Sequence, residues 1–231
     1  MYKNDRSAES FRLGREVDLL EHYPKSKRDI AARGDQKTES DREIARQFGA
    51  AFFDGERRHG YGGFQYHPRF WEPVIPTLQR FYDLKAGSRV LDVGCAKGFM
   101  LFDMVRLVPG IDVRGLDIST YAIEQAIPEM KPYLTVGNAT DLPYDDNAFD
   151  LVIAINTLHN LEGSALEQAF SEISRVSRQH AFITVDAFRD PEEQEAILAW
   201  NLTAKTIKSI DDWKAYFAKV GYAGDFYWFM P

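Results

Sequence analysis

The chain has 231 residues, a formal net charge of −7 and a sequence pI near 5.3. Apolar residues make up 45% and charged residues 27%, which is typical of a soluble globular domain and excludes a disordered, collagen-like or repeat chain. The acidic balance excludes a general electrostatic attraction to nucleic acid or to an anionic membrane, so a small molecule is the expected partner. A single cysteine, Cys95, and the lack of an apolar leader near the start predict a cytoplasmic protein without an internal disulfide.

The sequence predicts an N-terminal helical segment and an aromatic lid within residues 1–72. Both are expected to cover a core formed by residues 73–231. Residues 38–48 suit a short helix. Residues 49–72 combine aromatic side chains with glycines, which is typical of a loop that closes over a ligand. An earlier helix is predicted because apolar residues recur at a spacing compatible with one helical face at Phe11, Leu13, Val17 and Leu20.

From Ser88 onward, short β-rich runs alternate with helical patterns. The strand-like runs are RVLDV, VRGLDI, YLTVGN, DLVIAIN and HAFITVDA. Because such alternation produces βαβ units, we predict an α/β fold with a Rossmann-like, doubly wound, mainly parallel sheet of six or seven strands. Later in the chain, helices are expected from Pro191 and from Ser209, and a final strand from Phe226 to Met230.

The sharpest pattern is a strand that enters a glycine-containing turn at Val90–Gly98. Asp92 lies near the end of the strand, and residues 94, 96 and 98 are small. A turn without bulky side chains lets a ligand approach the backbone and the partly positive N-terminus of the helix that follows. A generic strand-to-helix turn, which needs glycine for its shape alone, is the alternative interpretation.

Asp117 ends the next predicted strand. A carboxylate at this place can accept hydrogen bonds from both ribose hydroxyls of a nucleoside, and its alternative role is that of a strand-end cap. The two motifs together resemble the class I S-adenosylmethionine-dependent methyltransferases of the small-molecule type. Dinucleotide-binding oxidoreductases use the same strand, turn and helix, but their G-x-G-x-x-G spacing is absent here.

The resemblance implies S-adenosyl-L-methionine as the cofactor. Asp117 would hold its ribose, and Asp92 with the turn that follows would hold its methionine part. The turn residues expected to contact the cofactor are Gly94, Cys95, Ala96 and Gly98. Ala96 stands where many family members have glycine.

A third motif lies at Val136–Pro143. Family members commonly have Gly-Asp-Ala here, with the carboxylate facing the adenine amino group, whereas this chain has Asn138. The amide oxygen of Asn138 can still accept from that amine, without charge assistance. The resemblance implies further cofactor contacts at Ile118, Ala139 and Asn156. In the aromatic loop, Tyr61 can close on the adenine or the sulfonium, and the alternative role of the loop is a hydrophobic latch that fixes the N-terminal segment to the sheet.

His159 is the expected catalytic residue. By the resemblance, the strand at 150–155 leads into a loop that faces the transferable methyl, where a neutral imidazole can take a proton from the acceptor. Its alternative role is to cap the following helix or to line the cofactor pocket.

No metal is expected, because no His/Cys cluster has ligand spacing and Asn156 stands where metal-dependent members have Asp. The expected acceptor contacts are Tyr66, His67, Arg69 and Asp186.

The predicted function is O- or N-methylation of a small polar metabolite by in-line transfer. The basic run at Lys25–Arg28 favours an anionic group on the acceptor, with a solvated face as the alternative. Two other functions stay open: methylation of RNA or protein, which the acidic charge opposes, and a non-catalytic subunit that only binds the cofactor.

The C-terminal strand leaves two arrangements for the edge of the sheet. Sheets of the resembled family usually finish with an antiparallel pair, yet Pro231 directly follows the predicted final strand. Either residues 206–209 add a short strand, or the sheet stops one strand early and leaves an edge that a second copy covers. We therefore expect a monomer or a weak homodimer.

Overall fold

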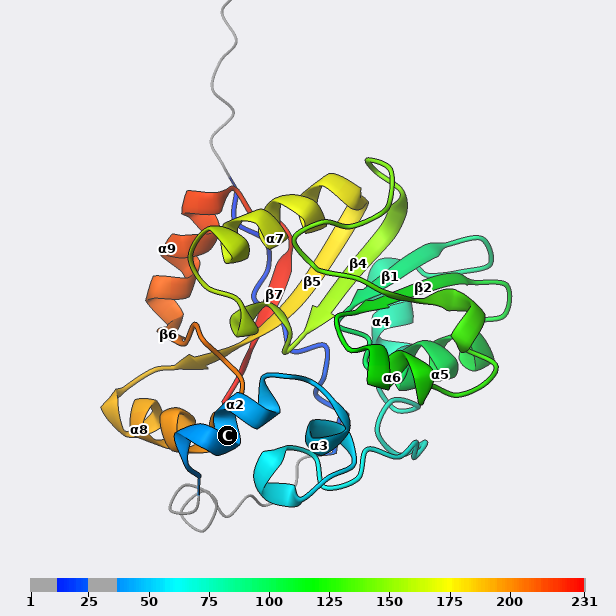
Figure 1. The fold of residues 1–231 in the computed structure, drawn as a ribbon. Helices are drawn as coiled ribbons and strands as arrows, with labels where there is room; N and C mark the ends of the chain where they lie inside the picture. Colours follow the sequence, from blue (N-terminus) through cyan, green and yellow to red (C-terminus); the bar gives the residue numbers. More distant parts are fainter. Residues whose placement is uncertain (1–11, 25–36, 231) are drawn as a thin grey trace, which may run out of the picture.

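A computed structural model describes residues 12–24 and 37–230. These residues form a seven-stranded sheet with helices on both faces (Figure 1). The strands follow the order β3-β2-β1-β4-β5-β6, and β7 also pairs with β5. Every pair of these strands is parallel. The predicted Rossmann-like α/β fold is confirmed.

The helices and strands have the following bounds. The strands are β1 (Arg89–Val93), β2 (Asp112–Asp117), β3 (Leu134–Val136), β4 (Phe149–Ile155), β5 (Ser177–Phe188), β6 (Lys208–Ser209) and β7 (Asp225–Phe229). The α-helices are α2 (Glu39–Ala45), α3 (Ala50–Phe53), α4 (Ile75–Tyr82), α5 (Phe99–Leu107), α6 (Thr120–Glu124), α7 (Gly163–Val176), α8 (Pro191–Trp200) and α9 (Ile210–Val220). Short 3-10 helices are η1 (Arg57–His59), η2 (Lys131–Tyr133) and η3 (Leu158–Asn160). Within the described ranges, no helix combines the length and the apolar composition that crossing a membrane requires.

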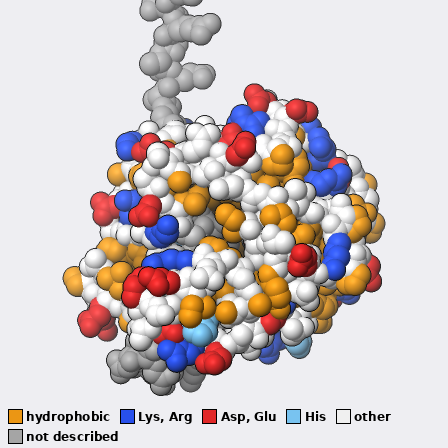
Figure 2. All heavy atoms as spheres, in the orientation of Figure 1, with side chains coloured by type: hydrophobic (Ala, Val, Ile, Leu, Met, Phe, Trp, Pro, Cys, Tyr) orange, Lys and Arg blue, Asp and Glu red, His pale blue; other side chains and the backbone are white. Residues whose placement is uncertain are grey.

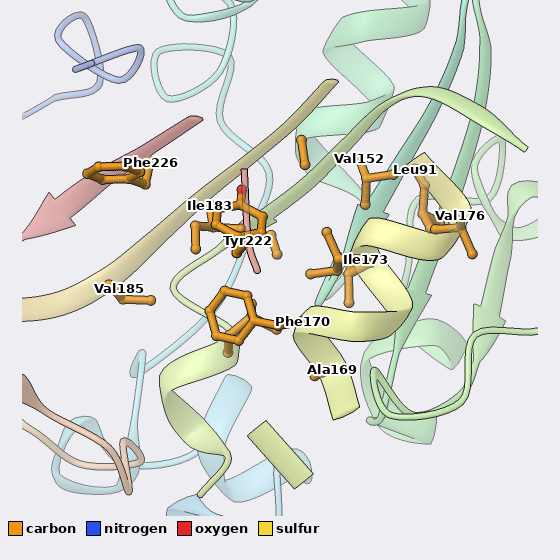
Figure 3. Close-up of a cluster of buried hydrophobic side chains, with 14 of the residues drawn as sticks. Leu91, Val152, Ala169, Phe170, Ile173, Val176, Ile183, Val185, Tyr222 and Phe226 are labelled. Atoms are coloured by element: carbon orange, nitrogen blue, oxygen red, sulfur yellow. The ribbon is translucent and has the colours of Figure 1, made fainter. Parts of the chain in front are cut away.

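Alternate residues of the central strands face two separate hydrophobic cores. In β4, Val152 and Ala154 join the core beneath α7 and α9, whereas Leu151 and Ile153 join the core beneath α4 and α5. Figure 3 shows part of the first core, in which side chains of α7 meet those of β4 and β5. Successive side chains of a strand point to opposite faces, so both faces of the sheet are buried. This double burial explains the near-continuous apolar runs in the sequence.

Residues 12–24 are extended or in turns, so the helix predicted from Leu13, Val17 and Leu20 is wrong. Val17 N–H donates to Phe226 O, and Phe226 N–H donates to Arg15 O, both at 3.0 Å. This segment therefore adds a parallel bridge to β7. Its apolar spacing suited a helix, but a sheet edge supplied the hydrogen-bond partners that a helix would otherwise find within itself.

The short helix predicted over residues 38–48 is confirmed as α2. It begins with a capping box, in which the side chains of Thr38 and Asp41 each accept from the other's backbone N–H. Phe11 and the basic run at Lys25–Arg28 lie outside the described residues.

The sheet does not end as the family pattern suggested. β6 confirms that residues 206–209 add a short strand, paired in parallel with Ala187 and Phe188 of β5. β7 also runs parallel to β5, where an antiparallel strand was expected. Residues 15–17 of the same chain cover the other side of β7. Of the two arrangements expected for this edge, the added short strand is the one observed. The expectation of a monomer or weak homodimer stays a prediction.

Candidate active site

The carboxyl ends of the parallel strands meet at one edge of the sheet, at the lower side of Figure 1. β1 lies between β2 and β4, so the strand order reverses there. In open α/β sheets this reversal makes the crevice where ligands bind. Three predicted site residues end or follow these strands: Asp92 in β1, Asp117 in β2 and Asn156 after β4.

The turn at residues 94–98 carries the chain from β1 into α5 through left-handed backbone. The φ angle is 84° at Gly94, 49° at Ala96 and 75° at Gly98. The N–H groups of residues 94 and 95 both donate to Leu116 O, which ties the turn to β2. A Cβ on Gly94 would lie 2.1 Å from Thr157 Oγ1 on the loop after β4. Glycine is therefore required there both for its φ and for the close approach of that loop.

Asp117 is held at the end of β2 by two backbone N–H groups. Ala96 N–H donates to Oδ2 at 2.7 Å, and Ser119 N–H donates to Oδ1 at 2.8 Å. Burial raises the pKa of this carboxyl, and the two N–H groups act in the opposite direction. Each carboxylate oxygen can accept about two bonds, so both keep capacity for a pair of hydroxyls. The carboxylate is thus fixed in place and suited to a ribose diol.

Asp92 is buried close to Asp117, with 6% of its surface exposed. Burial, together with the charge of Asp117, raises the pKa of Asp92 to about 8. The carboxyl is therefore mostly protonated at neutral pH, and a nearby cation would favour its ionised form. Asp92 suits the neighbourhood of an ammonium or sulfonium group.

The ends of β2 and β3 offer a surface for a nucleobase. Ile118 is 54% exposed although it is a large apolar side chain. Asn138 is exposed, and its Oδ1 accepts from Thr140 N–H at 3.0 Å, which is an Asx-type turn. Ala139 lies partly buried against the first core. The amide oxygen of Asn138 retains a second acceptor position for an adenine amine.

These groups fit S-adenosylmethionine by their chemistry. Asp117 would provide a fixed acceptor for the diol and Ile118 an apolar face for the base, and Asp92 is a buried acid that could balance a cation. The N-terminus of α5 adds a partly positive backbone end for a carboxylate.

His159 lies in η3 and is buried, with 4% of its surface exposed. Its Nδ1 accepts the backbone N–H of Asp186 at 2.9 Å. Burial lowers the pKa of the ring, against the opposing charge of Asp186. Nδ1 also lies 3.3 Å from Asp186 Oδ1, a contact that would need a proton on Nδ1, but the backbone N–H at 2.9 Å is the shorter one. With Nδ1 accepting that N–H, the neutral ring carries its proton on Nε2. This neutral tautomer offers a donor to a ligand, and it does not suit the general base that the sequence predicted.

Asn156 and Asp186 are also committed to contacts within the protein. Asn156 has φ of 51°, and its Oδ1 accepts from the hydroxyl of Thr184 at 2.8 Å. The backbone O of Asp186 accepts from Trp213 Nε1 at 2.9 Å, and its side chain is 8% exposed. Asp186 thus lies in the interior beside His159, which does not suit the predicted contact with an acceptor.

The cover at residues 37–72 is joined through Asp54 to the glycine turn at residues 94–98 and to the segment after Asp117. Asp54 is a residue that the sequence interpretation missed. Lys97 Nζ, within the glycine turn, lies 2.7 Å from Asp54 Oδ2 and donates to Phe64 O at 2.8 Å. Tyr121 OH, just after Asp117, donates to Asp54 Oδ2 at 2.8 Å. Burial alone would raise the pKa of Asp54, but these bonds and Phe64 N–H hold it below its ordinary value. The one sequence signal was a lysine inside a turn of small residues.

Three predicted acceptor contacts, Tyr66, His67 and Arg69, lie apart from the strand ends. Tyr66 OH donates to Asp103 Oδ1 at 2.6 Å and accepts from Arg106 at 2.9 Å. Burial and the bond to Asp103 raise the pKa of Tyr66 to about 12. Both partners belong to α5, one to two turns beyond its start. The Tyr66 ring also packs edge-on against Phe99, the first residue of α5, and Arg69 and His67 are exposed in the same segment.

Tyr61 lies in the aromatic cluster of the cover. Its ring centroid is 4.4 Å from that of Phe64, which in turn stacks on Phe99 at 5.0 Å. Phe99 is the first residue of α5, immediately after the glycine turn. Tyr61 is 44% exposed and lies in the part of the cover nearest the cofactor motifs.

Comparison with known proteins finds similarity to methyltransferases. A family model described as a methyltransferase domain matches residues 91–185. The chain is 30% identical over 129 residues to a malonyl-(acyl-carrier protein) O-methyltransferase of Legionella pneumophila, covering 54% of this chain and 45% of that protein. It is 31% identical over 152 residues to a demethylmenaquinone methyltransferase of Symbiobacterium thermophilum, covering 62% and 59%.

The chain therefore spans about half the length of these curated relatives. Among solved structures, the YcgJ protein of Bacillus subtilis matches with a TM-score of 0.52 at 19% identity, over 63% of this chain and 66% of that one, which supports the fold. Residues 91–185 thus match a methyltransferase domain, and both of these curated relatives are methyltransferases.

Proposed function

We propose that the chain transfers a methyl group from S-adenosylmethionine to an oxygen or nitrogen of a small polar acceptor in the cytoplasm. The observation that carries this proposal is Asp117, fixed by two backbone N–H groups beside the glycine turn. The matched methyltransferase domain covers the same strands, from β1 to β5. The net charge of −7 favours a small acceptor over a nucleic acid.

In this proposal the residues of the chain bind, orient and shield. The cofactor, when bound, supplies a methyl group on a sulfonium, which is already a good leaving group. Asp117 holds the ribose and Asp92 balances the cationic part, so the methyl group faces the end of β4. Alignment of reacting groups supplies roughly 7–11 kcal/mol of a barrier. The cover, fixed by Asp54, keeps water from the strand ends.

Removal of the acceptor proton is not assigned to His159. Its Nδ1 is occupied by Asp186 N–H, and its Nε2 carries a proton. His159 instead shapes the loop after β4, because its backbone O accepts the N–H groups of Lys205 and Thr206, both at 2.9 Å. We propose that positioning, rather than a dedicated base, is the main contribution of the chain.

Calorimetric titration with S-adenosylhomocysteine tests the proposal. Asp117→Asn removes one acceptor oxygen and its charge, so the Kd should rise about tenfold or more. Asp112→Asn, at the opposite end of β2, is the matched control and should leave the Kd unchanged. The proposal fails if the wild-type chain does not bind S-adenosylhomocysteine, or if both variants weaken binding equally while remaining folded.

A further inference from the structure

Helix α2 crosses the carboxyl edge of the sheet (Figure 1). Near its start, Lys37 Nζ donates to the backbone oxygens of Ala199 and Trp200 at the end of α8, which follows β5. Just beyond its end, Phe48 O accepts from the hydroxyl of Ser119, which follows β2. β1 and β4 lie between β2 and β5 in the sheet. Residues 37–48 therefore run from the end of α8 to the loop after β2, on the side of the sheet where β1 and β4 end (Figure 1).

Arg42 of α2 and Arg46, the residue that caps its C-terminus, lie on a half-buried face of the helix. Asp41 and Ala45 are buried, and Asp41 faces η1, where it contacts Arg58. Arg42 and Arg46, one turn apart, share a different face, and their side chains are 26% and 29% exposed. Figure 2 shows a hollow between α2 and the strand ends, with Lys and Arg side chains on its rim.

The charge on this face is only partly compensated. Glu39 accepts from Arg46 NH1 at 2.9 Å and lies 3.7 Å from Arg42 NH1. Two guanidinium groups thus share one carboxylate, whose side chain is 62% exposed. The Nε atoms of Arg42 and Arg46 are both buried without a hydrogen-bond partner among the described residues. Buried donors are usually satisfied, so this pair of N–H groups points to a ligand or to ordered water.

We propose that Arg42 and Arg46 bind a carboxylate or phosphate group of the methyl acceptor. A guanidinium offers Nε–H and a terminal N–H as a fork that matches two oxygens of such a group. The position over β4 places that anion beside the acceptor atom rather than beside the ribose of the cofactor. This inference rests on the proposed function and narrows its substrate class to small anionic metabolites.

A direct binding test does not require the acceptor to be known. The chain, saturated with S-adenosylhomocysteine, is titrated with inorganic phosphate while the arginine Nε–H signals are followed by NMR. The Nε–H signals of Arg42 and Arg46 are assigned by their absence from the spectra of Arg42→Lys and Arg46→Lys. In the wild type, both signals should shift and then saturate as phosphate is added. The signal of Arg57, an exposed arginine of the same cover, should not shift. Equal shifts at all three arginines, or no saturable shift, would overturn the proposal.

A turnover test uses carboxylated and phosphorylated acceptors with their neutral analogues. Arg42→Gln and Arg46→Gln should each raise the KM of an anionic acceptor about tenfold and leave the Kd for S-adenosylhomocysteine unchanged. Arg57→Gln removes the same charge from the cover and should change neither value. Neutral analogues should be turned over equally by the wild type and all variants. An unchanged KM of the anionic acceptor in both Arg42→Gln and Arg46→Gln would contradict the inference. Loss of S-adenosylhomocysteine binding by the wild type would instead contradict the proposed function.

Discussion

At the scale of single residues, His159 shows how a hydrogen bond defines a role. A histidine at the end of the fourth strand invites a catalytic interpretation, because imidazole titrates near neutral pH. The backbone N–H of Asp186 removes that freedom, since it occupies Nδ1, and burial lowers the pKa of the ring. Because burial disfavours the charged form, the neutral ring persists to lower pH than it does in a free imidazole.

Substitutions at His159 should therefore distinguish a structural role of the side chain from a catalytic one. His159→Asn, which can keep an acceptor for Asp186 N–H, should retain most of the kcat and of the free energy of unfolding. His159→Leu leaves that N–H unpaired, and should lower the free energy of unfolding by about 1–3 kcal/mol. Urea denaturation and the pH profile of kcat/KM measure both effects. A base role would be supported if both variants lost kcat without losing stability and the wild-type pH profile had an acidic limb.

At the scale of elements, the ion pair between Asp54 and Lys97 joins the cover to the glycine turn. The Lys97 side chain is 4% exposed and that of Asp54 is 23% exposed, so water screens the pair only in part. Because the pKa of Asp54 is lowered in the folded protein, the pair contributes stability at neutral pH. That stability is present above the unfolded pKa of about 4 and is lost as the pH falls further.

Breaking this pair from one side should loosen the cover. Asp54→Asn leaves Lys97 buried without its counter-charge, so we expect a loss of about 2–3 kcal/mol and faster hydrogen exchange in residues 48–64. Exchange in β1 and β4 should be unchanged, and Asp83→Asn, at an exposed pair, serves as the control.

The double variant Asp54→Asn/Lys97→Met removes both charges of the pair. It should be more stable than the sum of the two single losses predicts, because no buried charge is left alone. Strictly additive losses would mean that the two side chains act independently.

At the scale of the whole molecule, the N-terminal segment closes the sheet edge. Asp225 Oδ1 accepts from the backbone N–H and Nε of Arg15, both at 2.9 Å, and Arg15 NH2 lies 2.7 Å from its Oδ2. Trp228 Nε1 donates to Glu16 Oε1 at 2.7 Å. Residues near both ends of the chain are thus fixed together over β7, an edge that would otherwise offer unpaired backbone groups to another chain.

Arg15→Ala should weaken this closure. The loss of charge-assisted bonds to Asp225 should reduce the free energy of unfolding by about 1–3 kcal/mol and increase self-association in sedimentation velocity. Arg12→Ala, in the same exposed segment, is the matched control and should behave like the wild type. An unchanged melting temperature together with an unchanged sedimentation profile for Arg15→Ala would show that the segment does not protect the edge.

The sequence by itself determined the features that depend on local pattern. The alternating strands and helices, the left-handed turn that begins at Gly94 and the position of Asp117 follow from apolar periodicity, glycine and spacing along the chain. The tertiary structure alone decided which distant groups meet: Arg15 with Asp225, Asp54 with Lys97, and His159 with Asp186. Such contacts depend on how the packed sheet places separate segments, and no local propensity specifies the partner of a buried polar group.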